Sequence, residues 1–275
     1  MITLGREFYK MSGSGNDFVF IDARHEPAGA LDSPTRIQAI CARGTGVGAD
    51  GIVFLEPSPR ATVRMRYLNS DGSLAAMCGN ASLCTARLLI ELGGATPGQE
   101  FTIESDSGVL GARMTGENPE VDLAPVDRID VEAETGVAPG EKRAGYAVVG
   151  VPHLVLLQDD ISQVDVVGRG RPLRFHHALG PAGANVNFVA PAADPGAWLM
   201  RTYERGVEAE TLACGTGAVA CALMLAAWGL AQDRTVMVTR SGKRLTIRSR
   251  RVGGQVLPSL SGEARVVYQG RLAEI

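Results

Sequence analysis

The sequence predicts a mixed α/β protein made of two similar halves, each with many short strands around one apolar helix. An internal repeat indicates the two halves. Cys-Gly, a small polar residue and an Ala/Leu-rich stretch that ends at glycine occur at 78–93 and again at 214–229, about half a chain apart. Short runs of β-branched and aromatic residues, separated by Gly, Pro, Asn and Asp, indicate the strands. The hydrophobic content of 45% over 275 residues is enough for a packed core.

The individual elements follow from these patterns. The stretches after Cys78 and Cys214 are predicted to be helices, and each ends at glycine, which commonly stands just beyond a helix C-terminus. We expect residues 1–122, completed by a C-terminal strand within 264–275, to form one half, and residues 123–263 to form the other. The predicted strands are 18–21, 51–55, 63–68, 101–103, 146–149, 198–203, 236–239, 244–247 and 264–268.

Charge and the N-terminal sequence restrict the partners and the compartment. The net charge is −3, and the 27 Lys and Arg residues are scattered rather than clustered. A nucleic-acid or anionic membrane surface would need a basic stripe, so neither partner is expected. Residues 1–7 contain no apolar signal core, which favours a cytoplasmic protein. The five cysteines are an odd number, so we expect reduced thiols rather than a disulfide framework.

One apolar stretch, 212–230, is about long enough to cross a bilayer. It contains three glycines, is interrupted by Thr216, and has more alanine than leucine. A helix that is apolar on all sides can equally form the buried centre of a large domain. We therefore favour a buried helix over a membrane span.

The repeated Cys-Gly helix starts suggest proton chemistry. A helix N-terminus presents unsatisfied N–H groups and a partial positive charge, so it binds a carboxylate and also stabilises a thiolate. Two such ends facing each other would hold one carboxylate with a sulfur on each side. Cys78 and Cys214 could then remove a proton from one face of an α-carbon and return one to the other face, one as thiolate and one as thiol.

Other interpretations of the cysteines compete with this one. Free cysteines are often small buried hydrophobic residues, and we take Cys41, Cys84 and Cys221 in that sense. A metal site is not expected, because the spacings from Cys78 to Cys84 and from Cys214 to Cys221 are not those of usual zinc ligands. The matched sequence context separates Cys78 and Cys214 from the rest.

A cysteine hydrolase and two kinds of cofactor site agree less well with the residues. A cysteine hydrolase with His153 as the base remains open by residue type, but it does not explain two matched cysteines. Residues 46–51 match G-x-G-x-x-G, yet they precede the predicted strand 51–55 instead of opening a helix, so a dinucleotide site is not expected. Pyridoxal phosphate is not expected either, because no phosphate loop stands out and the chain has three lysines.

Eight ordered motifs carry a resemblance to a known family. They are residues 13–18, 46–51, 69–73, 78–80, 150–153, 185–188, 203–206 and 210–217. Over essentially its whole length the chain resembles the diaminopimelate epimerase family. The resemblance implies two pseudo-symmetric halves, each a mostly antiparallel, barrel-like sheet around a central helix, with the active site in the cleft between them. It also implies no cofactor, no metal, an amino-acid substrate and a homodimer to which Tyr268 contributes.

The resemblance also implies a role for each matching residue. Cys78 and Cys214 correspond to the acid/base pair, and His153 and Glu204 to the residues that tune the thiol pKa values. The residues implied to bind substrate are Asn16, Asn69, Gly79, Asn80, Asn185, Glu204, Arg205, Gly215 and Thr216. Of these, the glycines with Asn80 and Thr216 form the helix starts that hold the reacting carboxylate. Asn69, Asn185 and Arg205 read the distal carboxylate.

The chain departs from the family pattern at a few positions. Val151 stands where the family has asparagine, and valine cannot donate a hydrogen bond to the distal end of the substrate. Losing such a bond to a charged group costs about 1.5–3 kcal/mol. Ala81 replaces a frequent glycine, and Leu83 stands where arginine is common. Thr216 in place of serine is a mild change.

Three functions are therefore expected, in this order. The first is diaminopimelate epimerase, an isomerase that interconverts the LL and meso forms for lysine and peptidoglycan precursors. The second keeps the proton transfer but acts on another amino acid, such as histidine, and Val151 is its motive. The third is an amino-acid-binding protein without catalysis, which the presence of both cysteines disfavours.

Overall fold

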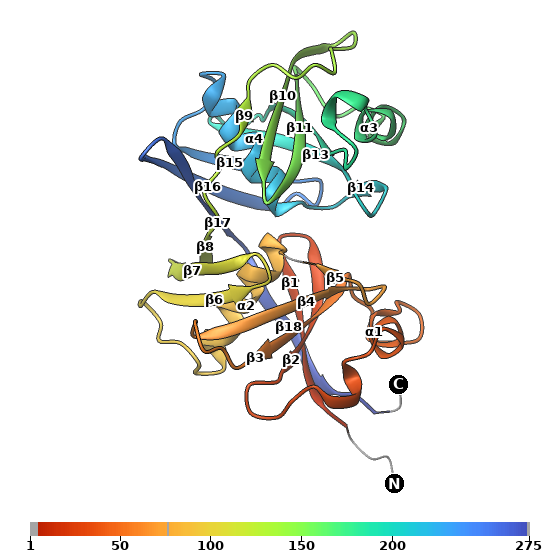
Figure 1. Cartoon of the computed structure of the whole chain (residues 1–275), viewed down its shortest axis with the longest axis vertical. Coiled ribbons are helices and arrows are strands. Elements are labelled where there is room, and N and C mark those ends of the chain that lie inside the picture. Colours follow the sequence, from red (N-terminus) through yellow and green to blue (C-terminus); the bar gives the residue numbers. More distant parts are fainter. Residues whose placement is uncertain (1–4, 76, 274–275) are drawn as a thin grey trace. The chain divides into compact units, whose positions relative to one another are not determined.

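The computed structural model describes residues 5–75 and 77–273, and the chain forms two compact units. Unit 1 contains the described residues up to Val121 and from Gly262 onward, and unit 2 contains Asp122–Ser261. In Figure 1 unit 1 is coloured from red to yellow and includes the last blue strand. Each unit has many strands and few helices, which confirms the predicted mixed α/β class. The pseudo-symmetric placement of the halves and the cleft stay predictions.

Unit 1 is a mixed sheet with one central helix. Its strands pair in the order β18–β1–β2–β3–β4–β6–β7–β8. The β2–β3 and β4–β6 pairs are parallel and the other pairs are antiparallel, while β5 pairs with β4. The elements are β1 (Glu7–Gly13), β2 (Asn16–Asp22), η1 (Gly29–Leu31), α1 (Pro34–Cys41), β3 (Gly51–Glu56), β4 (Val63–Asn69), β5 (Leu74–Ala75), α2 (Gly79–Glu91), β6 (Phe101–Ser105), β7 (Gly108–Thr115), β8 (Asn118–Asp122) and β18 (Ala264–Arg271).

Helix α2 is the core helix of unit 1. It packs against β1, β4, β6, β7 and β18, and ten of its thirteen residues are buried. Leu83, Leu88 and Leu89 are fully buried, and burial of such a side chain contributes roughly 1.5–3 kcal/mol. Gly13 in β1 lets the helix approach, since a Cβ there would lie 2.7 Å from the Cys84 Sγ. This packing fixes the position of the α2 N-terminus in unit 1.

Unit 2 repeats the same order and direction of pairing. Its strands pair as β9–β10–β11–β12–β13–β15–β16, parallel at β11–β12 and β13–β15 and antiparallel elsewhere, with β14 on β13. The elements are β9 (Ile129–Asp130), β10 (Glu141–Val149), β11 (Val151–Gln158), α3 (Val166–Arg174), η2 (His177–Leu179), β12 (Asn185–Pro191), β13 (Ala197–Glu204), β14 (Ala209–Thr211), α4 (Gly215–Ala227), β15 (Arg234–Val238), β16 (Arg244–Val252) and β17 (Gln255–Gly262).

Helix α4 occupies the corresponding place in unit 2. It packs against β10, β11 and β16, and ten of its thirteen residues are buried. Gly145 in β10 permits the contact, because a Cβ there would lie 2.4 Å from the Met224 Sδ. The helix lies within the apolar stretch 212–230. Among the described residues no helix is long and apolar enough to cross a membrane.

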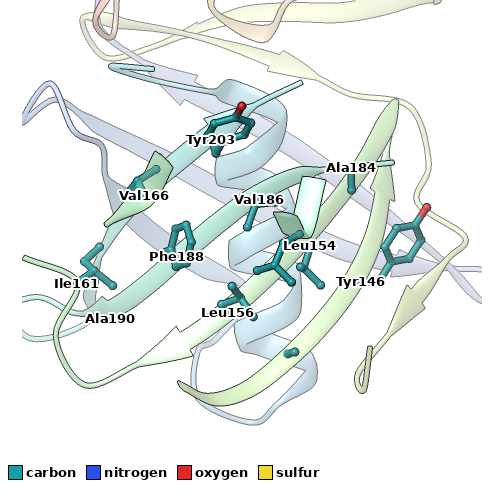
Figure 2. Close-up of a cluster of buried hydrophobic side chains, with 12 residues drawn as sticks. Tyr146, Leu154, Leu156, Ile161, Val166, Ala184, Val186, Phe188, Ala190 and Tyr203 are labelled. Carbon is teal, nitrogen blue, oxygen red and sulfur yellow. The ribbon is translucent and has the colours of Figure 1, made fainter. Parts of the chain in front are cut away.

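The strands of unit 2 have two buried faces. Leu154, Leu156, Val186 and Phe188 point to one face, where they form a hydrophobic cluster with α3 (Figure 2). Side chains alternate along a strand, so the residues between them point to the opposite face, against which α4 packs. This alternation places the odd-numbered residues at the start of β11 and β12, His153 among them, on the α4 side.

Candidate active site

Cys78 and Cys214 have the same local geometry. Each stands at the N-cap of its helix in an extended conformation, with φ −139° and ψ 117° at Cys78 and φ −137° and ψ 109° at Cys214. Each cysteine carbonyl accepts the first helical hydrogen bond, from Ser82 N and from Ala218 N, both at 2.9 Å. An extended N-cap directs the first-turn N–H groups, at Gly79 and Gly215 onward, toward a ligand.

The two sulfurs differ in exposure. Cys214 is 7% exposed, whereas Cys78 is half-buried. The Cys214 Sγ lies 3.7 Å from the Thr216 Oγ1. Gly217 packs directly against the same sulfur, because a Cβ at this position would lie 3.1 Å from it. The start of α4 is therefore tightly packed around its cysteine.

The other three cysteines lie inside the packed units. None of the five cysteines forms a disulfide, and Cys41, Cys84 and Cys221 are buried. Burial raises the pKa of Cys41 to about 11 and raises the pKa values of Cys84 and Cys221 well above the ordinary value. These thiols remain protonated near neutral pH, which fits a packing role. Among the described residues no group of three His, Cys, Asp or Glu side chains could hold a metal ion.

In unit 1, Asn16 is held by a chain of hydrogen bonds beside the start of α2. Asn80 Nδ2 donates to Asn16 Oδ1 at 2.6 Å, and Asn16 Nδ2 donates to Asp50 Oδ2 at 3.0 Å. Since a carboxylate only accepts, these two contacts fix which end of the Asn16 amide faces which neighbour. Asp50 was not among the residues that the sequence motifs assigned a role.

Asp50 belongs to the 46–51 motif, and the structure gives the motif a packing role. A Cβ at Gly46 would lie 2.0 Å from the Ala39 carbonyl oxygen, and a Cβ at Gly51 would lie 2.4 Å from the Leu68 carbonyl oxygen. The glycines thus let the loop pass close to α1 and β4. Glycines on both sides of Asp50 indicate a tightly packed loop. Comparison of residues 46–51 with the dinucleotide motif alone did not reveal this role.

Three charged residues support this loop. Lys10 is buried and pairs with Asp17 at 2.6 Å, while Arg43 pairs with Asp17 at 2.7 Å and with Asp50 at 2.6 Å. Burial disfavours ionised Asp17, but the hydrogen bonds from Arg43 and Lys10 outweigh it and hold the pKa of this carboxyl below its ordinary value. The Asp17 carboxylate therefore keeps its ion pairs with Lys10 and Arg43 at neutral pH.

In unit 2, His153 is completely buried in β11. Burial, with a smaller contribution from the charge of Arg205, lowers the pKa of His153 from 6.5 to about 3. Its Nδ1 lies 3.3 Å from the Asn187 Nδ2. Its Nε2 is buried and has no hydrogen-bond partner among the described residues. The imidazole is therefore neutral throughout the physiological pH range.

Three further residues meet where β12, β13 and β14 end or begin. Asn185 pairs with His153 across β11 and β12, and its Oδ1 accepts from the Arg205 backbone N at 2.7 Å. Glu204 Oε2 accepts from the Thr211 Oγ1 at 2.7 Å. The structure thus brings His153, Asn185, Glu204 and Arg205 to one end of the unit 2 strands.

Two residues with predicted roles remain, both in unit 1, and Asn69 pairs with Gly51 beside the Asp50 loop. Asn69 ends β4, where its Nδ2 donates to the Ser73 Oγ at 3.0 Å. Tyr268 lies on β18, is 45% exposed, and makes an edge-to-face contact with Phe8. Val151 is the partly buried first residue of β11. Asn187, to which sequence reasoning assigned no role although it lies in the 185–188 motif, contacts His153 directly.

Comparison with known proteins gives a consistent result. A family model described as diaminopimelate epimerase matches residues 8–129 and 145–267. A diaminopimelate epimerase of Gemmatimonas aurantiaca is 45% identical over 97% of this chain and 99% of its own length. One of Aquifex aeolicus is 40% identical over 98% of both chains.

Solved structures with lower identity share the fold. A hydroxyproline epimerase of Agrobacterium vitis with bound trans-4-hydroxy-L-proline has a TM-score of 0.71 at 18% identity, over 98% of this chain and 92% of its own. A phenazine biosynthesis protein of the PhzF family from Bacillus anthracis has a TM-score of 0.74 at 16% identity, over 97% and 98%.

Proposed function

The chain belongs to the diaminopimelate epimerase family, and we propose that it interconverts LL- and meso-2,6-diaminopimelate by α-proton transfer between Cys78 and Cys214. It is an isomerase. The reaction serves the synthesis of lysine and of peptidoglycan precursors. The observation that carries the proposal is the pair of cysteines at matched, extended N-caps.

The chemistry needs one thiolate and one thiol. The thiolate takes the α-proton and becomes a thiol, and the electron pair of the C–H bond moves onto the α-carbon and its carboxylate. The opposite thiol then donates its proton to the other face of the carbon and becomes the thiolate. The N–H groups and partial positive charge of both helix starts stabilise the carboxylate as its charge grows. Each turnover leaves the two sulfurs with exchanged protonation states.

The remaining residues are proposed to hold the substrate and to support the sulfurs. Gly79, Asn80, Gly215 and Thr216 hold the reacting carboxylate. His153 and Glu204 support the thiolate, and Asn69, Asn185 and Arg205 bind the distal carboxylate. Asn16 is a further substrate contact, and Glu204 with Arg205 lies near the amino and distal groups of the substrate. The fixed amide of Asn16 supports its role, since a preorganised group loses less freedom on binding.

The setting of the reaction also belongs to the proposal. The enzyme is cytoplasmic and acts without pyridoxal phosphate. It works as a homodimer with Tyr268 at the interface. The exposure of Tyr268 together with Val266 and Val267 on β18 supports a docking role for this strand, because neighbouring exposed apolar side chains are typical of interfaces.

Proton NMR of LL-diaminopimelate in D2O tests the function directly. With reduced protein, a chelator and no added pyridoxal phosphate, we expect loss of the α-proton signal and appearance of the meso isomer. Cys78→Ser and Cys214→Ser should each lower the rate by orders of magnitude while the folded state persists by circular dichroism. Near wild-type turnover in either variant would refute the two-thiol mechanism.

Val151 favours one alternative substrate class. Its side chain stands at the start of β11, two residues before His153, and offers no hydrogen bond to a distal carboxylate. A racemase of another amino acid, such as histidine, would keep both thiols. A panel of amino acids in D2O separates the two functions, because only the true substrate loses its α-proton. Binding without exchange for every compound would instead indicate a non-catalytic binding protein.

A further inference from the structure

A buried polar chain crosses three neighbouring strands of unit 2 on the side of α4. It joins His153 of β11, Asn187 of β12 and Thr202 of β13, none of which is more than 2% exposed. Asn187 is the central member. Its Oδ1 accepts from the Thr202 Oγ1 at 2.9 Å, and its Nδ2 donates to the Leu154 carbonyl oxygen at 3.0 Å. Buried polar groups of this kind are costly unless each is bonded, so the chain specifies one arrangement.

The contacts determine which end of the Asn187 amide faces His153. The Leu154 carbonyl can only accept a hydrogen bond, so the amide nitrogen must lie on that side. The same nitrogen is 3.3 Å from the His153 Nδ1 and supplies its second N–H there. The His153 Nδ1 must then be an acceptor without a proton. A neutral imidazole in this state carries its proton on Nε2.

The same asparagine lies under the first turn of α4. A Cβ at Gly217 would lie 2.6 Å from the Asn187 Oδ1 and 3.1 Å from the Cys214 Sγ. Glycine at 217 therefore allows the amide and the sulfur to approach the same point of the helix backbone. The orientation of His153 is thus set by a group that also packs beneath the helix start of Cys214.

We propose that Asn187 is a positioning residue that holds His153 as the neutral Nε2–H tautomer at the Cys214 helix start. His153 then acts as a fixed hydrogen-bond donor to the anionic state of the site, and it does not act as a general base. The inference rests on the proposed function for its catalytic consequence, whereas the tautomer itself is independent of any substrate.

Few charged groups lie on the elements that pack around the His153–Asn187 contact. Of the elements around His153, β12 carries no charged residue. On the α4 side of β10, Arg143 lies over the Trp228 ring. At the end of β13 lie Glu204, which accepts from Thr211, and Arg205, whose charge adds to burial in lowering the pKa of His153. Helix α4 adds two titratable side chains, Cys214 at its N-cap and Cys221 within the helix.

Nitrogen-15 NMR of protein labelled at its four histidines reads the tautomer without substrate. In the wild type we expect the His153 Nε2 to be protonated and the Nδ1 unprotonated from pH 8 to pH 5. Asn187→Asp replaces the N–H donor by an acceptor of the same shape, so His153 should become protonated at Nδ1. An Nδ1–H tautomer in the wild type would overturn the proposal, and this result needs no variant to fold.

The pH profile of kcat/KM separates positioning from simple loss of stability. In Asn187→Asp we expect a loss of about 100-fold or more, as when a histidine is held in the wrong tautomer, and a displaced acidic limb. Thr235→Val is the matched control, because it removes a buried hydroxyl of β15 that donates to the Gln232 carbonyl. It should lower stability and leave the tautomer and the profile unchanged. An unchanged profile in Asn187→Asp would refute the positioning role.

Failure of the proposed function gives a different pattern. If the wild type shows no α-proton exchange with any amino acid but His153 carries its proton on Nε2, the function is wrong and the assignment of Asn187 stands. If exchange is rapid and His153 carries its proton on Nδ1, the function stands and the assignment is wrong.

Discussion

Acid should destabilise unit 2 through His153. The folded-state pKa is about 3, against an ordinary value of 6.5. The unfolded chain therefore takes up a proton first as the pH falls, and the free energy of unfolding decreases below about pH 6.5. Each unit of pKa difference corresponds to about 1.4 kcal/mol. Protonation of His153 should lower the free energy of unfolding by about 2 kcal/mol at pH 5 and by about 4 kcal/mol near pH 3.

The assay compares wild type with His153→Gln at pH 7 and at pH 5. Glutamine keeps an acceptor for the Asn187 N–H but does not titrate. Both tryptophans, Trp198 and Trp228, lie in unit 2, so urea unfolding followed by tryptophan fluorescence reports this unit. All other titrating groups are common to both proteins and cancel in the difference. We expect the wild type to lose about 2 kcal/mol more than the variant between these two pH values.

Equal pH dependence of the two proteins would refute this reasoning. It would mean that His153 takes up a proton as readily in the folded protein as in the unfolded chain, and that its burial is not maintained in solution. A constant stability difference between wild type and variant at the two pH values is this refuting result. Only a change of that difference with pH reports proton uptake by His153.

Three other predictions concern particular side chains. Gly217→Ala should lower the free energy of unfolding by about 1–3 kcal/mol and reduce kcat, because its Cβ would lie 2.6 Å from the Asn187 Oδ1. Thermal unfolding and initial rates measure the two effects, and an unchanged rate would contradict the close packing. Asp50→Asn should raise KM more than it lowers kcat, since it loosens the Asn16 amide; steady-state kinetics decide, and an unaltered KM would count against it. Tyr268→Asp should convert the proposed dimer to monomers in sedimentation velocity, and a persistent dimer would exclude Tyr268 from the interface.

The sequence predicted the two central helices because local signals mark both ends. Each begins directly after its cysteine and ends shortly before a glycine, and the structure has α2 at Gly79–Glu91 and α4 at Gly215–Ala227. The predicted strands likewise fall within observed strands, apart from Thr239, which lies one residue beyond β15. These elements are apolar over most of their length, so pattern alone identifies them.

Three elements that carry or flank the site were not predicted, and each has a physical reason. Helix α3 contains two glycines, a proline and three arginines, and it is supported by the packing of Val166 and Leu173 on the sheet. Strand β11, which carries His153, has proline at its second position. Proline within an apolar run argues against a strand, so the strand was not predicted. Helix α1 did carry a usable signal, Ser33 before Pro34, and the Ser33 hydroxyl indeed accepts from the Arg36 N–H at its start.

The supporting residues of the site could not be found from spacing. Asn187 contacts His153 and Thr202, which are 34 and 15 residues away in the chain. These contacts arise only when β11, β12 and β13 lie side by side with their alternate residues on one face. Motifs mark where chemistry is concentrated, but the hydrogen-bond partners of a buried side chain depend on sheet register.

The central claim is that two different thiols act on one α-carbon, and the isotope content of the first product tests it most directly. LL-diaminopimelate is incubated in D2O, the reaction is stopped within the first few per cent of conversion, and product and recovered substrate are analysed by mass spectrometry. We predict deuterium in the meso product, delivered by the solvent-equilibrated second thiol, while the recovered LL isomer keeps its α-proton. A product that retains the original proton would show a single base acting on both faces, and it would contradict the two-thiol mechanism.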